Sequence, residues 1–187
     1  MTAANFPACF ATMEKYEGWH QFSNNPHDPG GATYSGVTQR AYDAYRISKG
    51  LPTQGVRRMT DPECQDIYQV DYWNLARCDE LFPGLDLCQF DECVNSGLVR
   101  ANKILQAALY VDVDGVFGLE TLGALQRLYV DVGALQRVTV RANLIRRVCS
   151  LRLGFWRSLP TWTYFGRGWY ARYAGIQTQA LAMSASS

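Results

Sequence analysis

The residues best suited to do chemistry lie together between positions 17 and 38. Glu17 stands at the end of an apolar helical pattern, Asp28 lies in the polar loop that follows, and Thr33 comes after the turn Pro29-Gly30-Gly31. Acid–base catalysed hydrolysis needs one acid to protonate the leaving group and a second group to activate or hold a water. Two carboxyl groups and a hydroxyl so close in sequence make this stretch the candidate active site.

Glu17 owes its position to a helix predicted over residues 5–17. Phe6, Phe10 and Met13 recur at helical spacing on one side of that helix, and Glu17 continues their stripe. A glycine follows at once, where helices commonly end. A carboxyl group at the edge of a core is partly removed from water and keeps its proton more readily, as a general acid requires. The alternative is that Glu17 simply leaves the helix end for solvent.

Most of the remaining chain is predicted to be helical. The alternating residues 32–38 favour a short β-hairpin. A capping box formed by Thr60 and Glu63, with Pro62 in the first turn, marks one helix start. Helical spacing predicts helices over 39–47, 60–74, 87–98, 101–110, 120–129 and 132–156. The sequence thus predicts a mainly α (α+β) fold with a small β-hairpin region near residues 28–38.

Composition and cysteine usage exclude several classes of protein. Of the 187 residues, 48% are hydrophobic and 19% charged, which fits one sizeable soluble domain or two small ones. No apolar run approaches the roughly 20 residues that span a membrane. The six cysteines form no CxxC pair and are expected to be reduced packing residues. His20, His27 and Asp28 are conceivable metal ligands, but both histidines lie in a predicted loop, so we expect neither metal nor cofactor.

Charge is distributed unevenly along the chain. Residues 1–126 hold 9 Lys and Arg against 16 Asp and Glu, whereas residues 127–187 hold 9 Arg against Asp131 alone. Such asymmetry indicates either a polyanionic partner or two halves that neutralise each other within one fold. Many of the arginines follow one face of the helix predicted over 132–156. A solvated helix face is the commoner explanation, and no recognised nucleic-acid module accompanies them, so nucleic-acid binding is not expected.

The C-terminal segment 161–173 is dense in aromatic residues and contains Arg167 and Arg172. Aromatic rings beside cations can stack on sugars or seal a core, and sealing the core is the simpler expectation near a C-terminus. The last residues, 180–187, are small and polar and are expected to be frayed.

Several stretches of the chain together resemble one known family, glycoside hydrolase family 108. Its members are N-acetylmuramidases, mostly phage endolysins and prophage-encoded lysozymes. The resemblance is carried by Glu17-Gly18, DPGGATYSGVT (28–38), TQRAYDAYR (38–46), YWNLARCDELFPGLDLCQFDECVNSG (72–97), ILQAALYVDVDGVFGLETLGAL (104–125) and FGRGWYARY (165–173).

The resemblance implies a lysozyme-like fold and hydrolysis of the β-1,4 bond between N-acetylmuramic acid and N-acetylglucosamine. Glu17 matches the essential acid. Asp28 and Thr33 are similar in order to the residues that hold a water in T4-type phage lysozymes, which favours a water-mediated, inverting route. The chain departs from the family where Trp19 directly follows Gly18, and the loop from there to Asp28 is longer.

Further residues are predicted to bind substrate. Asp91 and Asn95 lie one turn apart on one helix face and could bind the N-acetyl groups, although an ordinary surface pair is the alternative. Tyr34 and Trp73 are weaker candidates for stacking on sugar rings. Residues 1–97 are expected to form the catalytic region, and residues 98–187 a peptidoglycan-binding-like region. No linker divides the two, so we expect one compact unit.

The resemblance therefore implies a bacteriolytic, antimicrobial endolysin that acts on peptidoglycan glycan strands, and we expect it to act as a monomer. The Arg-rich C-terminal half could also attract anionic cell-wall or outer-membrane polymers. The N-terminal residues lack the basic head and long apolar core of a secretory signal. We therefore expect synthesis in the host bacterial cytoplasm and action on the periplasmic wall after release. A non-catalytic peptidoglycan-binding protein and a lytic transglycosylase are the alternatives.

Overall fold

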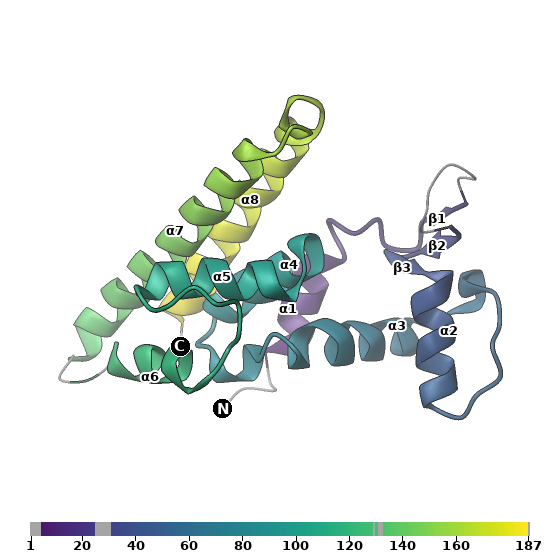
Figure 1. Ribbon diagram of the computed structural model, residues 1–187, viewed down its shortest axis with the longest axis horizontal. Coiled ribbons are helices and arrows are strands. Elements are labelled where there is room, and N and C mark those ends of the chain that lie inside the picture. Colours follow the sequence, from purple (N-terminus) through teal and green to yellow (C-terminus); the bar gives the residue numbers. More distant parts are fainter. Residues whose placement is uncertain (1–4, 25–30, 129, 131–132, 187) are drawn as a thin grey trace. The chain divides into compact units, whose positions relative to one another are not determined.

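The protein is mainly helical, with one small antiparallel sheet (Figure 1). The computed structural model describes residues 5–24, 31–128, 130 and 133–186. The chain divides into two compact units, of which unit 1 comprises residues 1–9 and 72–187 and unit 2 comprises residues 10–71. The mainly α fold with a small β region, predicted from the sequence, is confirmed.

Unit 2 contains the sheet and the short helices around it. Its elements are the end of α1 (Phe6–Met13), β1 (Phe22–Ser23), β2 (Thr33–Tyr34), β3 (Val37–Thr38), α2 (Gln39–Ser48), the 3₁₀ helix η1 (Val56–Arg58), α3 (Asp61–Tyr68) and the start of the π-helix η2 (Gln69–Asn74). The strands lie in the order β1-β2-β3 and are antiparallel. Phe22 faces Tyr34 across the first pair, and Thr33 faces Thr38 across the second.

Side-chain caps determine where two helices of unit 2 begin. The hydroxyl of Thr38 accepts a hydrogen bond from the backbone N–H of Ala41, which caps α2. The capping box of Thr60 and Glu63 is present at the start of α3, with Pro62 in the first turn. In both helices the capping side chains bond backbone N–H groups that have no partner within the helix. The helix start predicted at Thr60 is therefore confirmed.

The first helix ends one turn earlier than its apolar stripe predicts. α1 stops at Met13, and residues 14–20 form a series of turns. The N–H of Glu17 still bonds the carbonyl of Met13 at 3.1 Å, a helical spacing. Gly18 and His20 then adopt positive φ angles of 62° and 59°, which a right-handed helix excludes. The chain therefore leaves the helical path while keeping Glu17 one turn beyond Met13.

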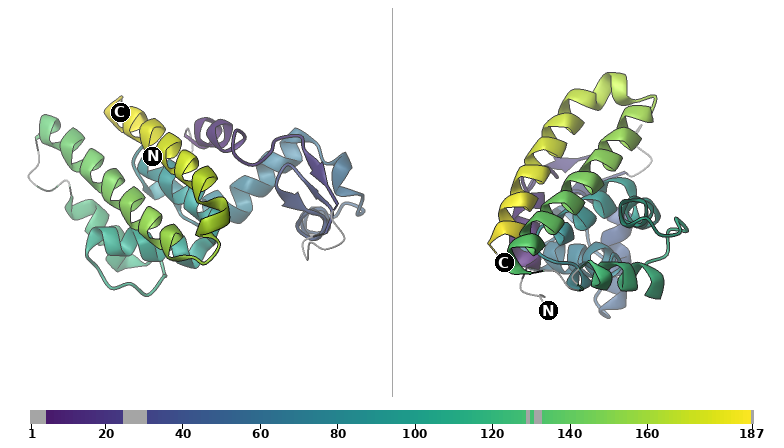
Figure 2. Two further views of the ribbon diagram at one scale, coloured as in Figure 1. Left: turned by 90° about the horizontal axis from the view of Figure 1, so that it is seen from above. Right: turned by 90° about the vertical axis from the view of Figure 1, so that its left-hand side faces the viewer.

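Unit 1 is a helical body from which a long helical hairpin extends. After the end of η2 its elements are η3 (Cys78–Glu80), α4 (Leu85–Ser96), α5 (Leu98–Leu109), α6 (Leu119–Arg127), α7 (Ala134–Ser158) and α8 (Trp162–Ala185). α7 and α8 run side by side in opposite directions and pack on α4 and α5 (Figures 1 and 2). The break predicted near Gly97 is present, at a φ of 83°. It separates α4 from α5, and both belong to unit 1.

The C-terminal residues continue α8, so the expectation that 180–187 are frayed is wrong for the described part of that segment. α8 runs to Ala185, and Ala180 and Ser184 are buried. Near its end α8 passes so close to the start of α4 that a Cβ on Gly84 would collide with the carbonyl oxygen of Ala180. Packing against α4 thus orders a terminus whose composition alone favours fraying.

Cysteines and membrane spans can be checked over the described chain. All six cysteines are free and buried, as the sequence predicts. No helix among the described residues has the length and apolarity needed to cross a membrane.

A buried ion cluster joins α4 to the hairpin. Asp91 is buried and accepts hydrogen bonds from Arg152 on α7 and from Nε and Nη2 of Arg172 on α8, the last two at 2.9 and 2.7 Å. Arg152 also lies 2.6 Å from the carboxylate of buried Glu92. Burial raises the pKa of Glu92, and the positive charge of Arg152 opposes that rise. Two arginines of the basic C-terminal region thus neutralise acids inside the fold.

Removing the shared acceptor should expose the cost of these buried charges. Asp91→Ala removes the carboxylate that Arg152 and Arg172 share, so we expect the free energy of unfolding to fall by about 3–5 kcal/mol. Denaturant unfolding followed by circular dichroism measures the change. Asn95→Ala, one turn further along α4, should change it by less than about 0.5 kcal/mol. Equal, small effects of both substitutions would contradict a structural role for the cluster.

Candidate active site

Glu17 lies against the turn of the β2–β3 hairpin. Its side chain is half-buried, and its Oε2 atom lies 3.4 Å from the point where a Cβ on Gly36 would stand. The hydroxyl of Tyr68 lies 2.5 Å from the same point. Only glycine leaves room there, so the missing side chain of Gly36 lets the carboxyl group and the phenol approach one turn of backbone.

The turn itself is a tight hairpin with two left-handed residues. Ser35 and Gly36 have φ angles of 49° and 77°, the sign that a two-residue type I′ hairpin requires at both positions. Ser35 is buried, and three hydrogen bonds stabilise its left-handed backbone conformation. Its Oγ accepts from the N–H of His20 at 2.9 Å, its N–H donates to Gln21, and its carbonyl accepts from Tyr68 at 3.3 Å. The turn is thereby tied both to the segment after Glu17 and to α3.

Aromatic rings hold the segment that carries Glu17. Phe10 meets Trp19 edge-on at 5.2 Å and Tyr68 at 5.5 Å between ring centroids. His20 stacks on Tyr34 at 6.2 Å, and its Nε2 lies 2.8 Å from a carboxylate oxygen of Asp61. Because Phe10 belongs to α1 and Tyr34 to β2, these contacts connect the helix, the turn and the sheet around one carboxyl group.

The other residues predicted for this site lie on the same hairpin or in its loop. Thr33 is half-buried on β2, and its hydroxyl donates to the carbonyl of Gly31 at 3.2 Å. Tyr34 follows it and is also half-buried. The structure therefore brings Glu17, Thr33 and Tyr34 into one unit, on elements that touch the same turn. Asp28 and His27 lie outside the described residues, so the role of Asp28 stays a prediction.

Three residues predicted to bind substrate belong to unit 1, where two of them are buried. Trp73 is enclosed by edge-on contacts with Phe6 and Phe90, both at 5.5 Å, and its indole N–H donates to Asp79 at 2.9 Å. A ring packed in this way presents no face to a sugar, so we assign Trp73 to the core. Asp91 likewise serves the buried ion cluster.

Asn95, the third of these residues, is exposed. Its amide donates to the carbonyl of Asp91 at 2.8 Å. The two residues, spaced i, i+4, are therefore joined by a hydrogen bond from the Asn95 side chain to the Asp91 backbone within α4. Helical spacing correctly indicated that Asp91 and Asn95 lie on the same side of one helix. It could not indicate that α7 and α8 pack over Asp91.

Ser35, Gly36 and Tyr68 were missed as site residues by sequence reasoning. The dipeptide Ser-Gly between two β-favouring pairs is a hairpin-turn signal. That signal identifies the turn but not what packs on it. The approach of Tyr68 and Glu17 depends on how α3 and the residues after α1 pack in three dimensions, which local sequence does not encode.

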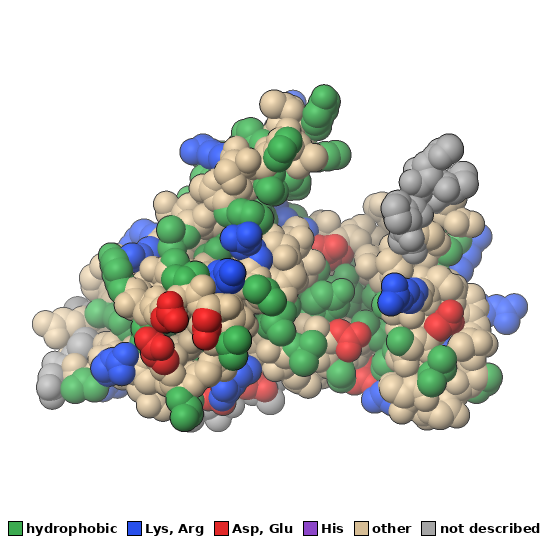
Figure 3. Space-filling view, viewed as in Figure 1, with side chains coloured by type: hydrophobic (Ala, Val, Ile, Leu, Met, Phe, Trp, Pro, Cys, Tyr) green, Lys and Arg blue, Asp and Glu red, His purple; other side chains and the backbone are tan. Residues whose placement is uncertain are grey.

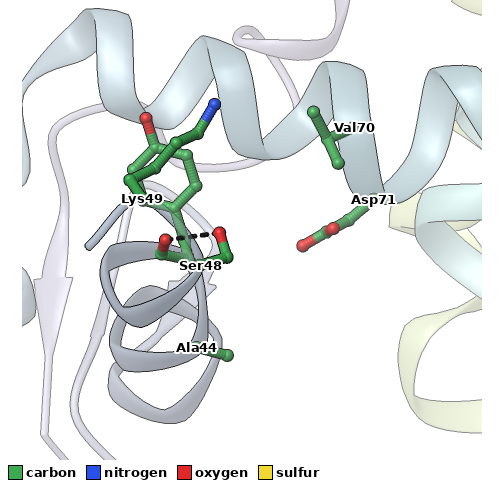
Figure 4. Close-up of a pocket in the computed structure, with 6 residues that line it drawn as sticks. Ala44, Ser48, Lys49, Val70 and Asp71 are labelled. Carbon is green, nitrogen blue, oxygen red and sulfur yellow. Dashed lines mark hydrogen bonds between the residues drawn. The ribbon is translucent and has the colours of Figure 1, made fainter. Parts of the chain in front are cut away.

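Unit 2 also contains a pocket of about 350 Å³ that is lined by none of these residues. Its lining residues are Ala44, Tyr45, Ser48, Lys49, Val70 and Asp71. Val70 and Asp71 project from the π-helix toward the end of α2 that carries Ala44 and Ser48 (Figure 4). Burial and the nearby charge of Asp66 raise the pKa of Asp71. Within the described chain, no group of three His, Cys, Asp or Glu residues could hold a metal ion.

Comparisons with known proteins identify the family of this chain. Residues 10–97 match the family model described as Glycosyl hydrolase 108. The chain is similar to the solved structure of SagA from Brucella abortus, with 32% identity, a TM-score of 0.76, and coverage of 97% of this chain and 96% of that chain. The chain belongs to glycosyl hydrolase family 108. A comparison with curated proteins gave no match.

Membership of family 108 makes the protein a glycoside hydrolase and confirms the family predicted from the sequence motifs. The matched residues 10–97 include Glu17, Thr33 and the hairpin turn. The likeness to SagA extends over nearly the whole chain, so the helices after residue 97 belong to the shared structure as well.

The turn glycine offers a direct test of this site. In Gly36→Ala the new methyl group meets the hydroxyl of Tyr68 at 2.5 Å and crowds Glu17. A shift of the carboxyl group should lower glycosidase activity by about 10²-fold, measured as release of reducing ends.

Gly50→Ala is the matched control for this substitution. Gly50 has a similar φ of 68°, but an added Cβ would have no neighbour within 4 Å. Both variants should therefore carry a similar backbone cost of roughly 1–2 kcal/mol, while only Gly36→Ala loses activity. Equal activities in the two variants would contradict the placement of Glu17 against the turn.

Proposed function

We propose that this family 108 hydrolase is an endolysin-type N-acetylmuramidase. It cleaves the β-1,4 bond between N-acetylmuramic acid and N-acetylglucosamine in bacterial peptidoglycan, with Glu17 as the general acid. The observation that carries this proposal is the half-buried side chain of Glu17, whose carboxyl group lies against a tight hairpin turn inside the region that matches the family.

Glu17 protonates the glycosidic oxygen as the bond breaks. A general acid must come within about 2.6–3.2 Å of the atom that receives its proton. The carboxyl group of Glu17 lies against the hairpin turn at Gly36. That turn is bound to the segment just after Glu17 by hydrogen bonds with His20 and Gln21. This restraint supports the role, because a preorganised acid loses little entropy on reaching the transition state.

Thr33 and Asp28 hold the attacking water on the other face of the sugar. The hydroxyl of Thr33 uses its proton to bond the carbonyl of Gly31, so its oxygen is oriented to accept a hydrogen bond from a water. Asp28 takes one proton from that water as it attacks, and the other proton stays on the new hydroxyl group of the sugar. This route inverts the anomeric carbon and requires the two carboxyl groups to stand about 6.5–9.5 Å apart.

Tyr34 provides a surface for a sugar ring. Its ring stacks on His20, which is in turn held by Asp61, so the orientation of the phenol is restrained. Rigid aromatic faces suit the apolar faces of pyranose rings. Tyr34 adjoins Thr33 on β2, which supports a subsite next to the proposed water.

The region after residue 97 contributes a second contact with the wall. Gln106 organises the loop that resembles a peptidoglycan-binding motif, because its amide donates to Asp114 at 2.7 Å and to the carbonyl of Val116 at 3.0 Å. The same loop exposes the apolar side chains of Val116 and Leu119. We infer that this fixed loop binds glycan strands, which places the enzyme at the periplasmic wall as an endolysin requires.

Replacing the proposed acid should abolish catalysis without unfolding the protein. Glu17→Gln keeps the size of the side chain but cannot donate the acid proton, so we expect hydrolysis of purified peptidoglycan to fall by about 10²–10⁴-fold. Glu14→Gln is the matched control, because Glu14 lies in the same segment and is also half-buried. It should retain activity within about twofold. More than a few per cent residual activity in Glu17→Gln would exclude Glu17 as the acid.

The products distinguish hydrolysis from the related transglycosylase reaction. Mass spectrometry of the released muropeptides should find reducing N-acetylmuramic acid ends, since a water opens the bond. Anhydro-muramic ends would instead indicate a lytic transglycosylase, and the absence of any product would indicate a binding protein.

The two proposed water ligands should each contribute to turnover. Asp28→Asn and Thr33→Ala should lower kcat by roughly 10-fold to 10²-fold through loss of water activation. Thr33→Ser keeps the hydroxyl and should restore most of the activity. Near-normal turnover in both Asp28→Asn and Thr33→Ala would confine catalysis to Glu17.

A further inference from the structure

The tip of the α7–α8 hairpin, residues 155–170, exposes aromatic side chains. Tyr164 is 82% exposed, Phe165 56% and Tyr170 49%. Figure 3 shows hydrophobic side chains gathered at the end of the hairpin, with basic side chains beside it. Exposed aromatics grouped in this way are uncommon on a soluble surface and mark an interaction site. The sequence favoured a core-sealing role for this segment, which holds for only part of it.

A ring cluster beneath these residues keeps the tip rigid. Trp169 is its centre, with ring centroids of Trp156, Trp162 and Phe165 at 5.9, 6.1 and 5.8 Å. Trp162 is the first residue of α8, and its ring lies so close along that helix that a Cβ on Gly166 would stand 2.7 Å from it. The exposed rings are therefore presented on a preorganised base, and binding would order few side chains.

The charge of the tip has a single sign. Arg157 and Arg167 are exposed there, and the guanidinium of Arg157 lies 5.8 Å from the ring centroid of Trp162. The sequence contains no Asp or Glu after Asp131. The tip thus complements an anionic surface, whereas pairing with the same tip of a second copy would bring like charges together.

The polar chemistry of the tip does not fit a sugar site. Residues 151–173 contain no Asp, Glu, Asn, Gln or His, so the tip lacks the carboxylate and amide acceptors that bind sugar hydroxyls. It is also the convex end of a hairpin, extending beyond α4 and α5 within unit 1 (Figures 1 and 2). A convex end suits a flat partner better than a single polymer strand.

We propose that this tip docks onto an anionic phospholipid membrane surface. Tyrosine and tryptophan rings favour the boundary between headgroups and acyl chains, where one end is apolar and the other wet. Phe165 enters the apolar side of that boundary, while Arg157 and Arg167 pair with lipid phosphates. The contact is independent of Glu17 and of the proposed muramidase reaction.

The test is cosedimentation of the full chain with vesicles. We expect binding to mixed phosphatidylglycerol and phosphatidylcholine vesicles, weaker binding as salt rises, and little binding to pure phosphatidylcholine. Tyr164→Ser with Phe165→Ser should weaken binding by about tenfold or more. Arg157→Gln with Arg167→Gln should weaken it by about fivefold for each arginine.

Matched substitutions elsewhere separate a specific surface from general stickiness or charge. Leu75→Ser with Val99→Ser removes exposed apolar side chains from another part of unit 1, and Arg40→Gln with Arg146→Gln removes two exposed charges that do not belong to the tip. Both controls should bind anionic vesicles as the unaltered chain does. The proposal is overturned if the unaltered chain does not bind, if the controls lose binding as the tip variants do, or if the tip variants lose binding only to purified peptidoglycan.

Discussion

The two-residue turn Ser35-Gly36 is the constraint on which the proposed active site depends. Both residues occupy left-handed backbone, and hydrogen bonds to His20, Gln21 and Tyr68 hold Ser35 there. The absence of a side chain at Gly36 then allows Glu17 to lie against the turn. A catalytic acid must be positioned close to the atom that it protonates. The backbone of this turn forms the surface against which the carboxyl group of Glu17 lies.

Unit 1 obtains its stability by a different means. Asp91 and Glu92 are buried on α4, and their charges are met by Arg152 and Arg172 from the two long helices. Buried charges are expensive to leave unpaired, so the cluster favours one way of packing the hairpin on α4. Because this cluster fixes α7 and α8 on α4, the end of the hairpin beyond Arg152 and Arg172 can present aromatic rings to a partner.

Local sequence was enough to predict elements whose cause is local. The capping box at Thr60, the short hairpin and the break at Gly97 each follow from side-chain chemistry or glycine backbone freedom, and each is present. Features set by distant packing were not predictable in this way. Trp73 was expected to meet a sugar but is enclosed by Phe6 and Phe90.

The candidate site shows the same division. Glu17 was identified from its place on the stripe of Phe10 and Met13, and it keeps helical spacing from Met13 although α1 has ended. The contribution of Tyr68, 51 positions away in sequence, comes from tertiary packing alone. The exposed aromatic side chains in the first turns of α8 are a further example. Aromatic composition alone does not show whether a segment lies in the core or on the surface.

In the proposed mechanism Glu17 delivers a proton to the glycosidic oxygen of peptidoglycan. A crystal structure of the Glu17→Gln variant with a bound muropeptide tests this geometry most directly. We expect the side chain at position 17 to lie within about 3.2 Å of the oxygen that joins N-acetylmuramic acid to N-acetylglucosamine, with a sugar ring over Tyr34. A glycan bound with that oxygen out of reach of position 17 would contradict it.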